Sequence, residues 1–105
     1  MILTDKAKIE FEKWLFKEYD LYYYNIISEI IWLNALIIEW FDSVGIYISI
    51  EVYGTPDFKI QYESNVSTKT DDWYLQGMLS EIYSTRQEAT IKAIEKANEI
   101  FNNQN

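Results

Sequence analysis

The chain has 105 residues, of which 49% are hydrophobic and 17% aromatic, and it carries a formal net charge of -8 at pH 7. So much apolar surface predicts one folded domain spanning residues 1–105 rather than a disordered chain. The sequence contains no cysteine and no histidine. It therefore excludes disulfides, thiol nucleophiles and Ser-His-Asp arrangements, and we expect neither an enzyme nor a bound metal or other cofactor.

The N-terminal segment does not have the pattern of a secretory signal, which is a basic stretch followed by an apolar one. The longest apolar run, residues 26–41, is short for a bilayer and contains Glu29, Asn34 and Glu39. Charged and amide side chains are costly in hydrocarbon. We therefore expect a cytoplasmic protein that does not contact a membrane.

A first helix is expected from Thr4 and Asp5, which are typical capping residues, to about Tyr19. Its core face is indicated by apolar residues at helical spacing: Ala7, Phe11, Trp14 and Leu15. Ile9 and Phe16 fall on the opposite side of the same helix. Because that side points away from the core, both residues are predicted to contact a partner or a second copy of the chain.

A second helix is expected over residues 25–42, which are rich in Leu, Ile, Ala and Trp and contain no Gly or Pro. Its polar side is narrow and contains Ser28 and Glu39. A helix that is apolar nearly all round is buried on most of its surface. In so small a domain this favours a homodimer or a partner surface, with Ile31 and Ile38 as predicted contact residues.

A β-hairpin is predicted next, because residues 46–53 alternate strictly between apolar and other side chains. After a turn at 54–57, Phe58, Ile60 and Tyr62 continue the alternation to residue 63. One face of this hairpin is apolar and the other is aromatic and charged. A polar loop is expected over 65–72, followed by a weaker third strand within 73–83 whose alternation is blurred by Gly77.

A capping box from Thr85 to Glu88 predicts the start of the last helix, which is expected to end near Asn102. Three alanines on its core face favour close approach to a sheet: Ala89, Ala93 and Ala97. The order α-α-β-β-(β)-α predicts an α+β fold, a small antiparallel meander with helices on one face. The other face of the sheet is expected to be open.

Acidic and aromatic residues are the candidates for a binding surface. Residues 21–64 contain six acidic residues and a single lysine, and such a surface favours a basic groove on a partner. Tyrosines give large contact areas at low entropic cost. A metal at the acidic loop is not expected, because no calcium-binding loop pattern is present. The predicted partner-binding residues are Tyr22, Tyr23, Tyr24, Tyr47, Glu51, Tyr53, Glu63, Asp71 and Asp72.

Three segments of the chain, residues 11–15, 41–50 and 84–102, resemble small accessory proteins encoded by phages and prophages of Bacteroidetes-type bacteria. The resemblance supplies no catalytic residues. It implies a phage protein that binds and inhibits a host defence protein, as anti-CRISPR proteins do. The expected partner is then a host protein such as an RNA-guided nuclease or its guide complex.

Two other functions remain open at this point. The order of helix, three-stranded meander and helix is also that of double-stranded RNA-binding domains, and Arg86, Lys92 and Lys96 lie on the last helix. Direct binding of nucleic acid is disfavoured by the scarcity of positive charge on the sheet. The third hypothesis is a homo-oligomeric structural or assembly factor whose apolar second helix forms the subunit interface.

Overall fold

The computed structural model describes residues 2–20, 30–69 and 75–104, except for the side chains of 30–32 and 75. These segments form an α+β fold whose element order matches the expected one, with the third strand present. The elements are α1 (Asp5–Tyr19), α3 (Ile30–Ser43), β1 (Ile46–Gly54), β2 (Ile60–Lys69), β3 (Leu75–Tyr83) and α4 (Arg86–Asn102).

The sheet is an antiparallel meander in the order β1-β2-β3. β1 pairs with β2 without interruption, from Ile46 opposite Thr68 to Gly54 opposite Ile60. The β2–β3 register shifts by one residue between Val66 and Ser67. The extra residue is Met78, next to Gly77. This β-bulge explains why the alternation of the third strand is blurred in the sequence, since a bulge puts two residues opposite one.

The second strand corrects two sequence-based expectations. Residues 65–69, predicted as loop, continue β2 and pair with both neighbouring strands. Their polar composition resembles a loop, but in a central strand two ladders of hydrogen bonds stabilise the extended backbone. Phe58, predicted to begin the strand, lies in the turn with φ +63° and is 97% exposed. β2 therefore begins at Ile60.

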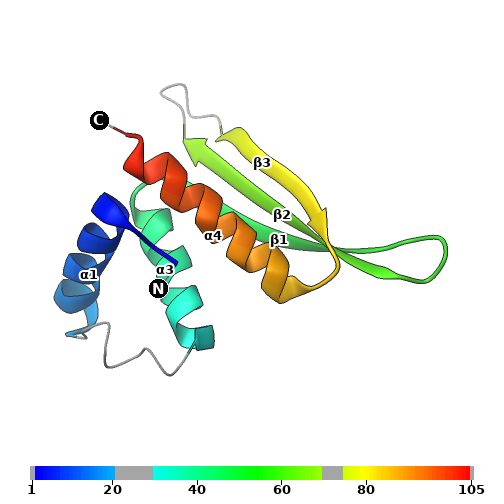
Figure 1. Cartoon of the computed structure of the whole chain (residues 1–105), viewed down its shortest axis with the longest axis horizontal. Coiled ribbons are helices and arrows are strands. Elements are labelled where there is room, and N and C mark those ends of the chain that lie inside the picture. Colours follow the sequence, from blue (N-terminus) through cyan, green and yellow to red (C-terminus); the bar gives the residue numbers. More distant parts are fainter. Residues whose placement is uncertain (1, 21–29, 70–74, 105) are drawn as a thin grey trace.

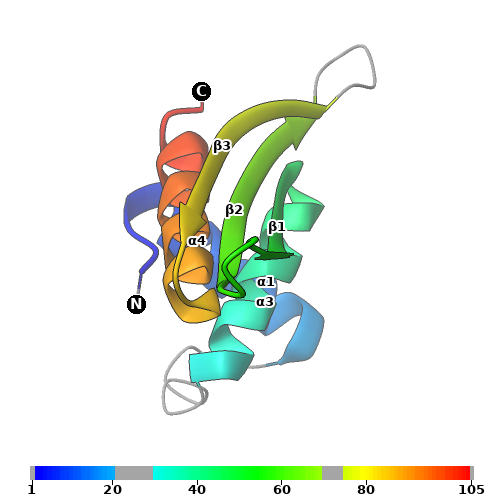
Figure 2. The same cartoon turned by 90° about the vertical axis from the view of Figure 1, so that its right-hand side faces the viewer.

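Helix α4 runs across one face of the sheet and contacts all three strands (Figure 1). In the view turned by 90°, β2 and β3 are strongly curved and α4 lies beside them (Figure 2). Its three small residues Ala89, Ala93 and Ala97 are fully buried, so the helix approaches the strands closely, as the sequence predicts. The buried Ser64 Oγ donates a hydrogen bond of 2.9 Å to Ala89 O, which satisfies a polar group that would otherwise be costly there.

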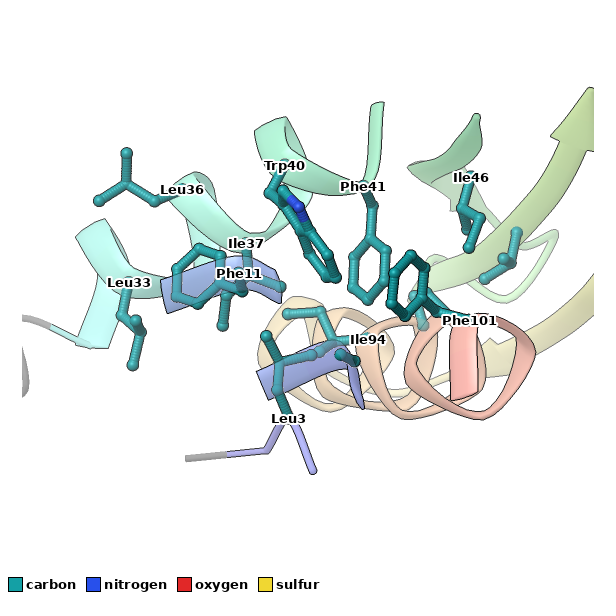
Figure 3. Close-up of a cluster of buried hydrophobic side chains, with 14 of the residues drawn as sticks. Leu3, Phe11, Leu33, Leu36, Ile37, Trp40, Phe41, Ile46, Ile94 and Phe101 are labelled. Carbon is teal, nitrogen blue, oxygen red and sulfur yellow. The ribbon is translucent and has the colours of Figure 1, made fainter. Parts of the chain in front are cut away.

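The core lies between α1, α3, α4 and the helix-side face of the sheet, and its centre is aromatic (Figure 3). Trp40 packs against Phe11, Phe41 and Phe101, with ring centroids 5.8, 4.8 and 4.9 Å apart. Helix α3 supplies two of these rings, Trp40 and Phe41, together with the buried Leu33, Leu36 and Ile37, and it contacts α1, α4 and β1. Much of its apolar surface is thus buried within one copy of the chain. The first residues of the predicted second helix, 25–29, lie outside the described residues.

The start of α1 is capped by a residue from the far end of the chain. Thr4 occupies the N-cap position, as predicted, but its side chain caps no backbone amide of its own helix. Instead Asn102 Oδ1 accepts a hydrogen bond of 2.8 Å from Ala7 N, and Asn102 Nδ2 donates to Thr4 O at 3.1 Å. One side chain of α4 thereby caps an amide in the first turn of α1 and joins the two helices.

We expect Asn102→Ala to lower the free energy of unfolding by about 1–2 kcal/mol, because it leaves a helix terminus without its cap. Asn103→Ala is the matched control, since Asn103 is exposed and ends α4 through its backbone N–H, which the substitution keeps; it should change stability by less than about 0.5 kcal/mol. Urea denaturation followed by circular dichroism measures both values. Equal effects of the two substitutions would contradict the capping role.

No helix in the described segments is long and apolar enough to cross a membrane.

Candidate binding face of the sheet

The register of the sheet decides which side chains share a face. On the helix side, Ile46 and Val66 are fully buried. Residues of opposite parity point away from the helices, and none of those described is buried. We call this side the open face. It carries Tyr47, Ser49, Glu51 and Tyr53 from β1, Gln61, Glu63, Asn65 and Ser67 from β2, and Ser80 and Ile82 from β3.

Two carboxylates lie directly opposite each other on the open face. Glu51 on β1 pairs with Glu63 on β2, a like-charge arrangement that destabilises a sheet unless other groups offset it. The Tyr53 hydroxyl donates to Glu51 Oε2 at 2.7 Å and is also within hydrogen-bonding reach of Glu63. Ser80 Oγ donates to Glu63 Oε1 at 2.6 Å. Hydroxyl donors from β1 and β3 therefore hold the two acids together.

The hydrogen bonds shift the pKa values of two of these groups in opposite directions. The hydrogen bond with Glu63, followed by that with Glu51, raises the pKa of Tyr53 above its usual value of 10.0. The hydrogen bond from Ser80, followed by that from Tyr53, lowers the pKa of Glu63 below 4.5. Each shift favours a phenol that donates and a carboxylate that accepts. At neutral pH the open face therefore keeps its negative charge.

Removing the Glu63 carboxylate, which accepts the hydrogen bond of Tyr53, should change the measured pKa of Tyr53. Because the Glu63 hydrogen bond is the largest cause of the shift, Glu63→Gln should lower the pKa of Tyr53 towards 10. A phenol whose pKa is raised by folding stabilises the fold below pH 10, and this contribution disappears as the pH rises through the folded-state pKa. Between pH 10 and the pKa that Tyr53 has in the folded native chain, the free energy of unfolding of the mutant should therefore fall less than that of the native chain.

The control for this titration is Tyr83, whose pKa is raised to about 12, chiefly by a hydrogen bond to Glu81. Glu63→Gln should leave Tyr83 unchanged. NMR titration of the tyrosine rings resolves the two residues. An unchanged pKa of Tyr53 in the mutant would show that Glu63 does not accept its hydrogen bond.

The carboxylates of the open face have no cationic neighbour in the described part of the chain. The ion pairs found there are elsewhere: Lys13–Glu10 on α1, Lys92–Glu95 and Lys96–Glu99 on α4, and Lys59–Asp57 at the hairpin turn. Glu51 and Glu63 take part in none of them. The negative charge at the centre of the open face is thus uncompensated within these residues, and it can attract a cationic group from outside.

Sequence reasoning did not predict the two polar residues at the centre of this face, Ser80 and Asn65. Ser80 was not singled out, because a serine in a weakly patterned strand carries no signal of its own. Asn65 was assigned to a loop, yet it lies at the centre of the face between Ser49 and Ser80. Its Nδ2 is buried and has no acceptor among the described residues. The alternation of Glu63, Asn65 and Ser67 with Ser64 and Val66 was the signal that could have placed it.

The structure brings together Tyr47, Glu51, Tyr53 and Glu63, the four predicted residues that belong to the sheet. Five further candidates lie outside the described residues: Tyr22, Tyr23, Tyr24, Asp71 and Asp72. Across residues 2–20, 30–69 and 75–104 there is no group of three acidic side chains that could hold a metal ion.

The predicted contact residues on the helices are not part of the open face. Ile9 and Phe16 are exposed on α1, on the side away from the core, as the periodicity predicts. Ile38 is only partly exposed and packs against the core, and the side chain of Ile31 is not described. The role of these four residues as contacts remains a prediction.

The basic residues of α4 contact aromatic or acidic side chains of the same chain. The Arg86 guanidinium lies 5.2 Å from the centre of the Tyr62 ring, a cation–π arrangement. Lys92 and Lys96 each lie 3.5 Å from a glutamate of the same helix. Because exposed ion pairs of this kind are weak, they do not prevent binding of phosphate, but they reduce the net positive charge that an RNA-binding helix needs.

Comparisons of the chain with protein-family models, with curated proteins and with solved structures found no significant match. The open face must therefore be interpreted from its own chemistry.

Proposed function

We propose that the chain is a binding protein rather than an enzyme, and that its open face docks onto a basic surface of a bacterial protein that handles nucleic acid. The observation that carries the proposal is the Glu51–Glu63 pair, two uncompensated carboxylates positioned by Tyr53 and Ser80. Tyr47 and Tyr53 on the same face supply aromatic contact area. Preorganised charge beside aromatic surface is suited to recognition.

Nucleic-acid-handling proteins present basic grooves that bind phosphates. An acidic face that fits such a groove competes with the nucleic acid and thereby inhibits the protein. The resemblance to phage accessory proteins supplies the setting for this proposal. It makes the chain an anti-CRISPR-like inhibitor, with an RNA-guided nuclease or its guide complex as the proposed target.

Direct binding of nucleic acid by the chain itself is the less favoured function. The tyrosines of the open face could stack on bases, but the same face carries two opposed carboxylates that repel phosphates. The cations of α4 lie next to acidic or aromatic side chains. Both observations support a protein partner over a nucleic acid.

Affinity capture from a lysate of a bacterial host tests the proposal. The tagged protein is incubated with lysate with and without nuclease treatment, and the captured material is identified by mass spectrometry. We expect a nucleic-acid-handling protein that resists the nuclease treatment and elutes as salt screens the charges. Recovery of nucleic acid alone, or of the bait alone, would contradict the proposal.

A further inference from the structure

The outer edge of β1 presents unpaired backbone groups over half of its length. The amide of Thr55 donates to Lys59 O, and that of Lys69 donates to Gly45 O; both bonds join residues directly opposite each other. Since hydrogen-bonded pairs alternate in an antiparallel ladder, the odd residues of β1 bond to β2. The even residues Ile48, Ile50 and Val52 therefore point their N–H and C=O groups outward, and no backbone bond joins these groups to another described residue.

This edge lacks most of the features that usually protect an edge strand, and Glu51 is the one charged residue in β1. Within β1 there is no proline and no lysine, and its register with β2 has no bulge. The opposite edge strand, β3, does carry a bulge. Regular edges without such features are templates for another strand. Ile46 at the start of β1 is fully buried, so the accessible part of the edge extends from Ile48 to Gly54.

The accessible part of β1 also carries apolar side chains that nothing in the described chain covers. The β1–β2 hairpin extends past the ends of β3 and α4 (Figure 1). On its helix-side face Val52 is 49% exposed and Ile60, which is paired with Gly54, is 54% exposed. A Cβ atom at Gly54 would meet nothing within 4 Å. There is thus open space beside these side chains at the edge of the sheet.

We propose that β1 pairs antiparallel with β1 of a second copy of the chain, around a two-fold axis at Val52. This pairing places Ile50 opposite Gly54 of the second copy, so the outward even residues of both edges bond to each other. Each Val52 then contacts its own counterpart, and each copy covers the exposed apolar surface of the other. The interface is self-complementary, as a two-fold dimer requires.

Charge selects this register over its nearest alternative. An axis at Glu51 would place two glutamates directly opposite each other, which destabilises a sheet. With the axis at Val52, Glu51 lies opposite Tyr53 of the second copy. The result is one continuous sheet that displays two open faces side by side. The inference does not rest on the proposed function, because the open face is complete within a single copy.

Cross-linking with single cysteines tests the register. The native chain has no cysteine, so a disulfide in a single-cysteine variant can only join two copies. Directly opposed residues in a ladder have Cα atoms about 5.5 Å apart, within the range of a disulfide. Val52→Cys should therefore give a covalent dimer on mild oxidation. Ile82→Cys is the matched control, similarly exposed at 56% but on the opposite edge strand, and should remain monomeric.

Sedimentation equilibrium of the native protein, without any partner, tests the dimer itself. We expect reversible dimerisation with a dissociation constant of about 10–100 µM, as suits a small interface. Val52→Lys should weaken it at least tenfold, because two lysines would meet at the axis. A native chain that stays monomeric at about 1 mM, or equal cross-linking of Val52→Cys and Ile82→Cys, would overturn the inference. Neither result would affect the proposed function.

Discussion

Reversing both charges of the open face with Glu51→Lys and Glu63→Lys together should weaken partner binding about 100-fold or more. A basic surface that is attracted by two carboxylates is repelled by two ammonium groups, and charged contacts of this kind are worth about 2–5 kcal/mol when one side is altered. Folding should survive, because Glu51 is exposed and Glu63 is partly exposed, and charges in contact with solvent contribute little to stability. Isothermal calorimetry with the captured partner measures the change.

The matched control is the double substitution Glu18→Lys and Glu99→Lys, which changes the net charge by the same amount on α1 and α4. Both residues are exposed and lie away from the open face. We expect less than about a fivefold loss of affinity, due to the weaker overall attraction. If the two double variants bind equally well, overall charge rather than the open face determines binding.

Trp40→Ala should give the largest loss of stability among core substitutions, about 3–5 kcal/mol. Trp40 is buried and contacts three other aromatic rings, from α1, α3 and α4. Its removal leaves a cavity where three helices meet. Since domains of this size are stable by about 5–15 kcal/mol, the variant should unfold at much lower urea concentration.

The control for this substitution is Ile9→Ala on the exposed side of α1. It should change the free energy of unfolding by less than about 0.5 kcal/mol. Circular dichroism follows both unfolding curves without relying on tryptophan fluorescence. A loss of less than about 1 kcal/mol for Trp40→Ala would show that the three helices do not share one core around this residue.

Periodicity predicted most of the fold. The spacing of Phe11 and Leu15 fixed the buried side of α1, and the strict alternation of β1 fixed which of its side chains point away from the helices. The composition of the candidate face followed from that alternation, since Tyr47, Glu51 and Tyr53 have one parity. Local patterns are enough here because each element buries one continuous face.

What the sequence could not predict depends on contacts between distant residues. The second half of β2 has few apolar side chains, and only pairing with both neighbours makes it a strand. Asn102 caps α1 across 95 residues of chain, and no local pattern marks such a bond. Ser80 reaches Glu63 only because β2 and β3 pair with a shifted register.

The structure also changes the reason for expecting an oligomer. The sequence favoured a subunit interface on the second helix, because that helix is apolar nearly all round. In the structure Leu33, Ile37 and Trp40 of α3 are buried inside one copy of the chain, which accounts for much of this pattern. The free edge of β1 is now the stronger reason to expect a dimer.

Hydroxyl-radical footprinting of the chain with and without its captured partner tests the role of the open face most directly. Tyrosine and phenylalanine rings are oxidised where they are accessible, and a partner protects the rings that it covers. We predict protection of Tyr47 and Tyr53 on the open face, with Phe16 on α1 oxidised as before. Protection of Phe16 with Tyr47 and Tyr53 unchanged would show that the partner binds the helices, and would contradict binding through the open face.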